Sequence, residues 1–187
     1  YLNPDQAFSD IRILKSLGCK VEDATLPPVS DYNGVGRVLI SAEAYALHEA
    51  TLKTRLSDYS RVFRIRVLSG ALIRAADYIN AQRRRSDLIA ATAEAFRKFD
   101  VLICAPTADA APMLTEQRPD EGFAKPFVTT VANVAAVPSM VVCGGFTATG
   151  LPLGLEIMGQ AWNDATVLRV GHHFEQASGT RARRPTP

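Results

Sequence analysis

Residues 99–107 read FDVLICAPT, and this stretch decides the fold together with the segments that follow it. Residues 101–105 are a continuous apolar run, which is typical of a strand covered on both faces. Pro106 ends that strand. Residues 106–126 are then rich in Pro, Asp and Glu without periodicity, so they predict a loop of roughly twenty residues, long enough to be functional or mobile.

A β-hairpin is predicted after this loop. Pro138 begins a strand over residues 139–143. Gly150 lies in the turn, where glycine accepts a positive φ, and the chain returns as a second strand over residues 153–158.

Helices are predicted on both sides of the hairpin. Residues 127–136 form a short apolar helical piece that carries Asn133. Asp164 caps a final helix that ends near Ala177. The apolar stripe of this last helix consists of Val167, Leu168, Val170 and Phe174.

The first 99 residues predict mainly helix. Asn3 caps a helix that begins with Pro4 and stops at Gly18. Residues 19–26 follow as a short strand closed by two prolines. This α/β unit has no earlier strand to pair with, as expected if the chain starts partway through a larger sheet. Further helices are predicted over residues 35–56, residues 61–73 with an interruption at Gly70, and residues 77–99.

The fold class predicted from this order is α/β, with a mixed β-sheet covered by helices. No internal repeat, low-complexity tract or linker divides the chain, so residues 1–187 form a single domain or part of one.

Bulk composition excludes several classes of partner. The net charge is +2 and 47% of the residues are hydrophobic, which is normal for a globular core and gives no field for nucleic acid or a membrane surface. No apolar run is long enough for a transmembrane helix. The run Arg83-Arg84-Arg85 is interpreted as a solvated helix face.

The three cysteines indicate neither a disulfide framework nor a zinc site, because they are widely spaced and odd in number. Cys104 and Cys143 lie in apolar runs. We interpret the cysteines as reduced, buried thiols of a cytoplasmic protein, and we expect no metal and no cofactor.

Motifs distributed over most of the chain resemble those of the amidase-signature hydrolases. The matching residues are Asp100-Val101-Leu102 with Pro106-Thr107; Phe127, Asn133 and Pro138; Gly144-Gly145, Gly150-Leu151-Pro152, Gly154-Leu155-Glu156 and Gly159; and Asp164, Leu168 and Glu175, with Glu43, Arg66 and Asp77-Tyr78 upstream. The resemblance implies the C-terminal half of an amidase-signature domain. It also implies hydrolysis of the carbon–nitrogen bond of a non-peptide amide to a carboxylate plus ammonia or an amine.

The sequence departs from the family pattern at three places. Glu156 stands where Gln is usual, and Ala136 stands where Gly is usual. Pro126 precedes Phe127 where the tRNA-dependent glutamine amidotransferase subunits have Asp. This last change weighs against a glutaminase that acts on free glutamine, since a substrate bearing an ammonium group favours a carboxylate there.

The catalytic machinery implied by the resemblance has no match in this chain. The family uses a nucleophilic serine, a second serine and a lysine, and the serines lie in a Gly/Ser-rich segment. No lysine here is followed by such a segment, and neither Ser69 nor Ser139 has glycine-rich surroundings. We therefore expect no catalytic residue in this chain, and no activity from the chain alone.

Three residues are candidates for substrate binding: Thr107, Phe127 and Asn133. Thr107 and Asn133 follow apolar segments at the ends of elements, where α/β proteins form their binding crevices. Each has a structural alternative. Thr107 can bond to neighbouring loop backbone, Asn133 can brace its own turn, and Phe127 can be a core aromatic. Arg66 either pairs with Glu43 or faces the substrate.

Two rival functions remain open. A thiol hydrolase would use Cys104 or Cys143 with His172 or His173, but thiols in apolar runs have raised pKa values and adjacent histidines on a helix diverge by about 100°. A non-enzymatic binding or structural domain derived from an amidase is the other alternative.

The expected partners follow from the resemblance. They are a small-molecule amide substrate and the missing N-terminal half of the same enzyme. A homo-oligomer that forms through exposed apolar surface is also compatible with the sequence. Nucleic acid and membranes are not expected partners.

Overall fold

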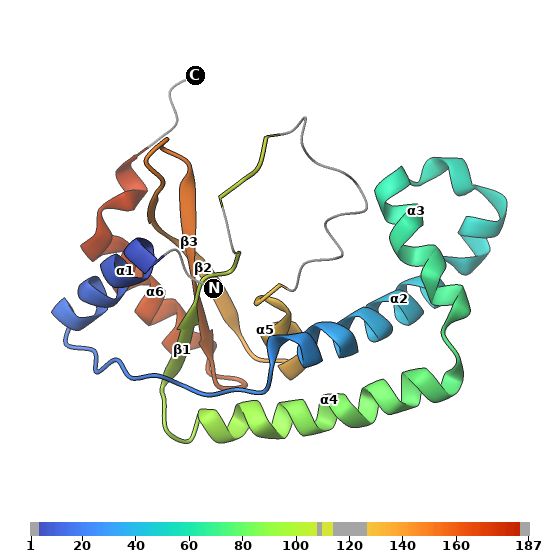
Figure 1. Ribbon diagram of the computed structural model, residues 1–187, viewed down its shortest axis with the longest axis horizontal. Coiled ribbons are helices and arrows are strands. Elements are labelled where there is room, and N and C mark those ends of the chain that lie inside the picture. Colours follow the sequence, from blue (N-terminus) through green and yellow to red (C-terminus); the bar gives the residue numbers. More distant parts are fainter. Residues whose placement is uncertain (1–3, 108–109, 114–126, 184–187) are drawn as a thin grey trace.

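The computed structural model describes residues 4–107, 110–113 and 127–183 of this chain (Figure 1). The helices that position the cavity and the sheet are α1 (Pro4–Ser16), α2 (Val29–Thr54), α3 (Arg61–Leu68), α4 (Ala75–Ala95), α5 (Thr130–Ala135) and α6 (Asp164–Ser178). Short 3-10 turns are η1 (Leu56–Asp58), η2 (Ser69–Leu72) and η5 (Thr180–Ala182). The predicted cap Asn3 and most of the predicted loop over residues 106–126 lie outside the described residues.

The described strands form one antiparallel sheet in the order β1-β3-β2. The strands are β1 (Val101–Cys104), β2 (Ser139–Phe146) and β3 (Pro152–Gly159). The predicted hairpin is confirmed, with Gly150 at φ +88° in its turn. The α/β class is also confirmed, but the pairing differs from the expected mixed sheet because both neighbours of β3 run antiparallel to it within the described chain.

The sheet buries a separate core on each face. Successive strand residues point to opposite faces, so Ile157 and Met158 of β3 enter different cores. Ile157 packs with Leu14 of α1 and Phe174 of α6. Met158 packs in a second core with residues such as Leu88 of α4. Figure 1 shows α1 and α6 on one side of the sheet, and α2, α4 and α5 on the other.

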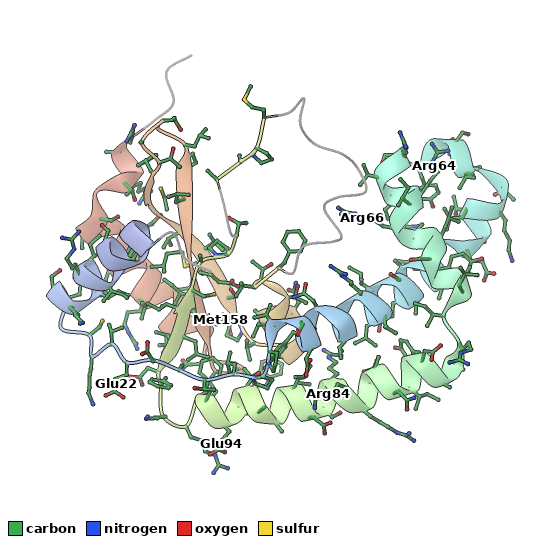
Figure 2. The ribbon with its side chains drawn as sticks, viewed as in Figure 1. Glu22, Arg64, Arg66, Arg84, Glu94 and Met158 are labelled. Carbon is green, nitrogen blue, oxygen red and sulfur yellow. The ribbon has the colours of Figure 1, made fainter. Side chains whose placement is uncertain are left out.

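Helices α2 and α4 pack side by side, and α3 lies between them in the sequence. The Tyr32 hydroxyl and Thr92 Oγ1 form a buried hydrogen bond of 2.7 Å between α2 and α4. An ion pair joins Arg84 of α4 to Asp31 of α2 (Figure 2). The predicted interruption at Gly70 is confirmed. A Cβ there would lie 2.1 Å from the Ser41 carbonyl oxygen, so only glycine lets η2 cross α2 this closely.

Residues 19–26 do not form the predicted strand. They run without regular structure, and only Val21 and Leu26 of this segment are partly buried. A strand needs a hydrogen-bonded neighbour, and none of the three described strands pairs with this segment. The following helix begins at Val29 and not at residue 35.

Three further predictions about the helices need correction. Asn163, and not Asp164, is the residue before the first turn of α6. Leu168 is 59% exposed and therefore does not belong to the buried stripe of α6, whereas Val167 and Phe174 do. Arg85 is not part of a solvated face, because its Nε donates to the Val134 carbonyl oxygen of α5 at 2.9 Å.

No helix in the described part of the chain is long and apolar enough to cross a membrane.

Candidate functional site

A cavity of about 620 Å³ lies between α2, α3 and α5. Apolar and polar side chains line it in similar numbers, with three arginines and one glutamate among the polar ones. The lining includes Ile40, Glu43, Phe63, Arg66, Phe127 and Asn133. Figure 2 shows Arg66 on the side of α3 that faces the sheet.

Phe127 is held at the cavity by the buried amide of Asn33. The Phe127 backbone N–H donates to Asn33 Oδ1 at 3.0 Å, and Asn33 Nδ2 donates to the Phe127 carbonyl oxygen at 3.0 Å. Asn33 Nδ2 also donates to the Val29 carbonyl oxygen at 2.9 Å. Both ends of the Phe127 residue are therefore fixed to α2, while Phe127 stays 42% exposed.

The sequence reasoning missed Asn33. No local signal marked it, because the predicted helix begins at residue 35 and leaves Asn33 before it, whereas Asn33 lies inside the 26-residue α2. A buried asparagine needs partners for both its NH2 group and its carbonyl oxygen. Backbone N–H and C=O groups in a loop, which have no partner in a helix or strand, can supply them.

Asn133 projects from the short helix α5 into the same cavity. Its side chain is exposed and makes no hydrogen bond to any other described residue. Helix α5 itself is fixed at its C-terminal end, because Arg85 satisfies the Val134 carbonyl oxygen and Ala136 turns the chain with φ 55°. The amide of Asn133 is thus presented to the cavity from a positioned backbone.

Thr107 is the third candidate binding residue. It is exposed, follows β1 and the buried Pro106, and is not among the residues that line this cavity. Of the three candidate binding residues, Phe127 and Asn133 line this cavity and Thr107 does not.

Glu43 is held by two consecutive hydrogen bonds from α4. The Tyr78 hydroxyl donates to Glu43 Oε1 at 2.9 Å, and Gln82 Nε2 donates to the Tyr78 oxygen at 2.9 Å. Arg66 lines the same cavity as Glu43. Their expected ion pair stays a prediction.

Glu156 is a buried carboxylate at the centre of the sheet. It accepts hydrogen bonds from Ser139 Oγ at 2.7 Å and from Cys104 Sγ at 3.5 Å. Burial, and secondly the charge of Glu156, raise the pKa of the Cys104 thiol far above its ordinary value. Cys104 is therefore a poor nucleophile at neutral pH, as the sequence indicated.

The other thiol candidates also lack a catalytic arrangement. Cys143 Sγ donates to the Gly145 carbonyl oxygen at 3.4 Å. His172 and His173 are exposed on α6, which packs on the opposite face of the sheet from α2 and α5. Cys19 is exposed, so the interpretation of all three cysteines as buried was wrong for that residue.

Two lysines with described partners, Lys53 and Lys20, form ion pairs at the surface. Lys53 pairs with Glu49 at 2.8 Å, and that carboxylate raises the pKa of Lys53. Lys20 is likewise paired with Glu22, and the hydrogen bond raises its pKa. A lysine that acts as a base needs the opposite shift, toward the neutral amine. Lys53 and Lys20 are therefore unsuited to that role.

No group of three or more His, Cys, Asp or Glu side chains within residues 4–107, 110–113 and 127–183 is placed to hold a metal ion.

The chain is similar to known amidases over nearly its whole length. The Amidase family profile matches residues 6–168. One relative, from the glutamyl-tRNA(Gln) amidotransferase of Synechococcus sp. (strain RCC307), is 28% identical, with 92% of this chain and 41% of that protein aligned. Fatty acid amide hydrolase from Medicago truncatula is 30% identical, with 91% of this chain and 30% of that protein aligned.

The solved structures agree on the fold. A crystal structure of an amidase superposes with a TM-score of 0.80 at 24% identity, covering 94% of this chain and 42% of that one. An allophanate hydrolase from Kluyveromyces lactis superposes with a TM-score of 0.81 at 22% identity, covering 94% of this chain and 30% of that one. The chain thus spans less than half the length of these relatives.

Proposed function

The chain belongs to the amidase family, and on that premise we propose that it forms one wall of the substrate cavity in an enzyme that hydrolyses non-peptide amides. The reaction breaks the carbon–nitrogen bond of a carboxamide with water and gives a carboxylate plus ammonia or an amine. Phe127 and Asn133 contact the substrate in this proposal, and Thr107 lines the approach to it.

The observation that carries the proposal is the convergence of Phe127 and Asn133 on one cavity. The two residues were selected from the sequence alone and are separated by the start of α5. An exposed ring beside an exposed amide suits a substrate that has an apolar body and a polar carboxamide. Asn133 would orient the amide, and Phe127 would hold the apolar part.

The nucleophile belongs to polypeptide outside this chain. The two best rival nucleophiles within it are Cys104 and Cys143, and each donates its thiol hydrogen to a nearby oxygen of the sheet region. In the proposed enzyme a neutral lysine would deprotonate the nucleophilic serine through a second serine, and backbone amides would hold the oxyanion. This chain would contribute substrate binding and no covalent step.

The sheet is also suited to receive further polypeptide. The outer strands β1 and β2 each have an edge that no described strand covers. Val141 of β2 is 53% exposed on the sheet face that carries Glu156. Uncovered edges and apolar faces favour association, so we propose the N-terminal half of the same enzyme as the partner and self-association when that half is absent.

The substrate is proposed to be an amide other than free glutamine. Pro126, on which this exclusion rests in the sequence, lies outside the described residues. The cavity supports the same direction, because its lining among the described residues includes three arginines and one glutamate, a composition that disfavours an ammonium group.

Activity measurements on two polypeptides test the proposal. The 187-residue chain should give no turnover of any amide, whereas the protein isolated from its natural source should carry additional polypeptide by intact mass and should hydrolyse amides. In that protein Asn133→Ala should lower kcat/KM by about tenfold, the loss of one hydrogen bond. Asn80→Ala, an exposed asparagine of α4 away from the cavity, is the matched control.

A non-enzymatic binding domain is the second candidate, since no catalytic lysine or serine was found in the sequence. The two candidates separate cleanly. If the protein isolated from its natural source begins at Tyr1 and binds amides without hydrolysing them, the binding-domain candidate is supported. Turnover by the 187-residue chain that survives Cys104→Ala and Cys143→Ala contradicts both.

A further inference from the structure

We propose that the cavity between α2, α3 and α5 binds an aromatic ring of the amide substrate, and that Phe63 is the residue that determines this specificity. The inference rests on the proposed function in treating the ligand as a substrate, but the binding site itself consists of residues of this chain. Phe63 belongs to α3 and was not among the residues selected from the sequence.

A three-ring cluster fixes the position of Phe63. The rings of Tyr59 and Phe63 are stacked, with centroids 5.1 Å apart and planes 12° apart. The ring of His48, from α2, packs edge-on against Phe63 at 5.2 Å and against Tyr59 at 5.5 Å. Nδ1 of His48 and the Tyr59 hydroxyl are also hydrogen-bonded at 3.1 Å. Aromatic pairs at these separations add stabilisation beyond their buried area.

The backbone of Phe63 is fixed as well. Its N–H donates to Ser60 Oγ at 3.3 Å, so Ser60 caps the first turn of α3. At the other end of this segment, Gly70 packs against the Ser41 carbonyl oxygen. Phe63 is therefore a wall of fixed position, which is what selection by shape requires.

Apolar side chains from other elements line the same cavity as Phe63. Phe127 lines the same cavity and is fixed by the Asn33 amide, and Ile40 of α2 lines it with 64% of its surface exposed. Phe63, Phe127 and Ile40 thus give one cavity apolar side chains from three parts of the chain, which suits a flat aromatic ring. A small aliphatic acyl group would leave most of this apolar surface in contact with water.

The charges that line the cavity favour the same ligand. Guanidinium groups are attracted to the faces of aromatic rings, and the described lining residues include Arg37, Arg66 and Arg85 beside the carboxylate of Glu43. The same charges repel a ligand that carries its own ammonium group. The ligand class is therefore a neutral aryl amide, for which phenylacetamide is a simple probe.

Binding to the 187-residue chain provides the first test. Phenylacetamide is titrated into ¹⁵N-labelled protein and its affinity is compared with those of acetamide and benzylammonium. We expect phenylacetamide to bind at least about tenfold more tightly than either and to shift the amide signals of Phe63 and Phe127. Equal affinities, or shifts confined to residues outside the cavity, would overturn the inference.

Variants identify the residue responsible. Phe63→Ala should weaken phenylacetamide binding about tenfold, and Phe63→Leu, which preserves bulk and folding, should weaken it by a smaller factor of about three. Trp162→Ala is the control, since Trp162 is 96% exposed and lies outside the cavity. If both Phe63→Ala and a folded Phe63→Leu variant bind phenylacetamide with unchanged affinity, Phe63 does not determine the specificity.

Kinetics on the natural full-length protein separate this inference from the proposed function. The ratio of kcat/KM for phenylacetamide over acetamide should fall in Phe63→Leu. Turnover with an unchanged ratio removes the inference and leaves the amidase function. Ring-selective binding without any amide turnover removes the amidase function and leaves the aromatic site.

Discussion

The sheet with α1 and α6, which we call the sheet layer, and the segment from α2 to α4, which we call the helical arm, bury their apolar residues to different degrees. In the sheet layer Ile157 and Phe174 have no exposed surface. In the helical arm Leu47 and Leu72 remain 80% and 84% exposed, and Ile40, which is 64% exposed, lines the cavity. The core between the sheet and helices α1 and α6 is closed, whereas the outer surface of the helical arm presents apolar residues to a ligand or to further polypeptide.

The largest effect expected from this comparison is in the sheet layer. Phe174→Ala should lower the free energy of unfolding by about 3–5 kcal/mol, because it leaves a cavity in a fully buried core. Urea unfolding measures the change. Leu168→Ala, on the outer face of the same helix, should change the free energy of unfolding by less than about 0.5 kcal/mol.

Equal losses in these two variants would mean that α6 is covered on both faces. The distinction between a closed core beside α1 and α6 and an exposed apolar surface on the helical arm would then be wrong.

The second prediction concerns the junction between the cavity and the helical arm. Asn33→Ala should destabilise the protein by about 2 kcal/mol, because it leaves the backbone N–H and carbonyl of Phe127 without their partner. It should also release the Phe127 ring and weaken phenylacetamide binding. Asn133→Ala is the matched control for stability, since this exposed amide makes no hydrogen bond to another described residue.

A stable Asn33→Ala protein with unchanged ligand binding would show that Phe127 is held by something other than α2. Chemical denaturation and the ligand titration are carried out on the same samples, so the two readouts can be compared directly.

The success of sequence reasoning depends on whether the signal for an element is local in the sequence. The hairpin, β1 and α6 were predicted because alternating or continuous apolar runs and glycine turns are local signals. Residues 19–26 were predicted wrongly as a strand, since Val21 and Leu26 supply apolar residues but no described strand supplies hydrogen bonds to them. Strand pairing is a long-range property that a local pattern does not contain.

The site was predicted only in part, and for a related reason. Phe127 and Asn133 were found because they are close in sequence to the motifs that the chain shares with amidases. Phe63 and Asn33 were missed because their roles depend on contacts with His48, Tyr59 and Phe127 across elements. Such contacts appear only once the helices are packed.

The third prediction uses pH to probe the sheet layer. Burial, assisted by the charge of Glu156, raises the pKa of Cys104 above the value of 9.0 for a free thiol. An acid whose folded pKa is raised favours its protonated form, so the folded state holds the proton while the unfolded state loses it. The free energy of unfolding should then fall by up to about 1.4 kcal/mol per pH unit above pH 9.

Cys104→Ala should flatten this decline between about pH 9 and pH 10. Tyr32 has a raised pKa for the same main reason, burial, and adds its own decline above about pH 10. A decline of equal slope in Cys104→Ala over that range would mean that the Cys104 thiol reaches solvent. Thermal unfolding across the same range makes the measurement.

The smallest expected effect lies where α5 meets β2, at the boundary between the two regions. Ala136 has φ 55°, a left-handed conformation that costs a residue with a Cβ about 1–2 kcal/mol and costs glycine little. Ala136→Gly should therefore raise the free energy of unfolding by roughly 0.5–1 kcal/mol, after the greater entropy of the unfolded glycine is subtracted. Ala135→Gly, one residue earlier and still helical, should lower it by a similar amount. Opposite signs at neighbouring alanines would locate the strain in the turn itself, whereas destabilisation by both changes would mean that α5 continues through residue 136 in solution and presents Asn133 differently.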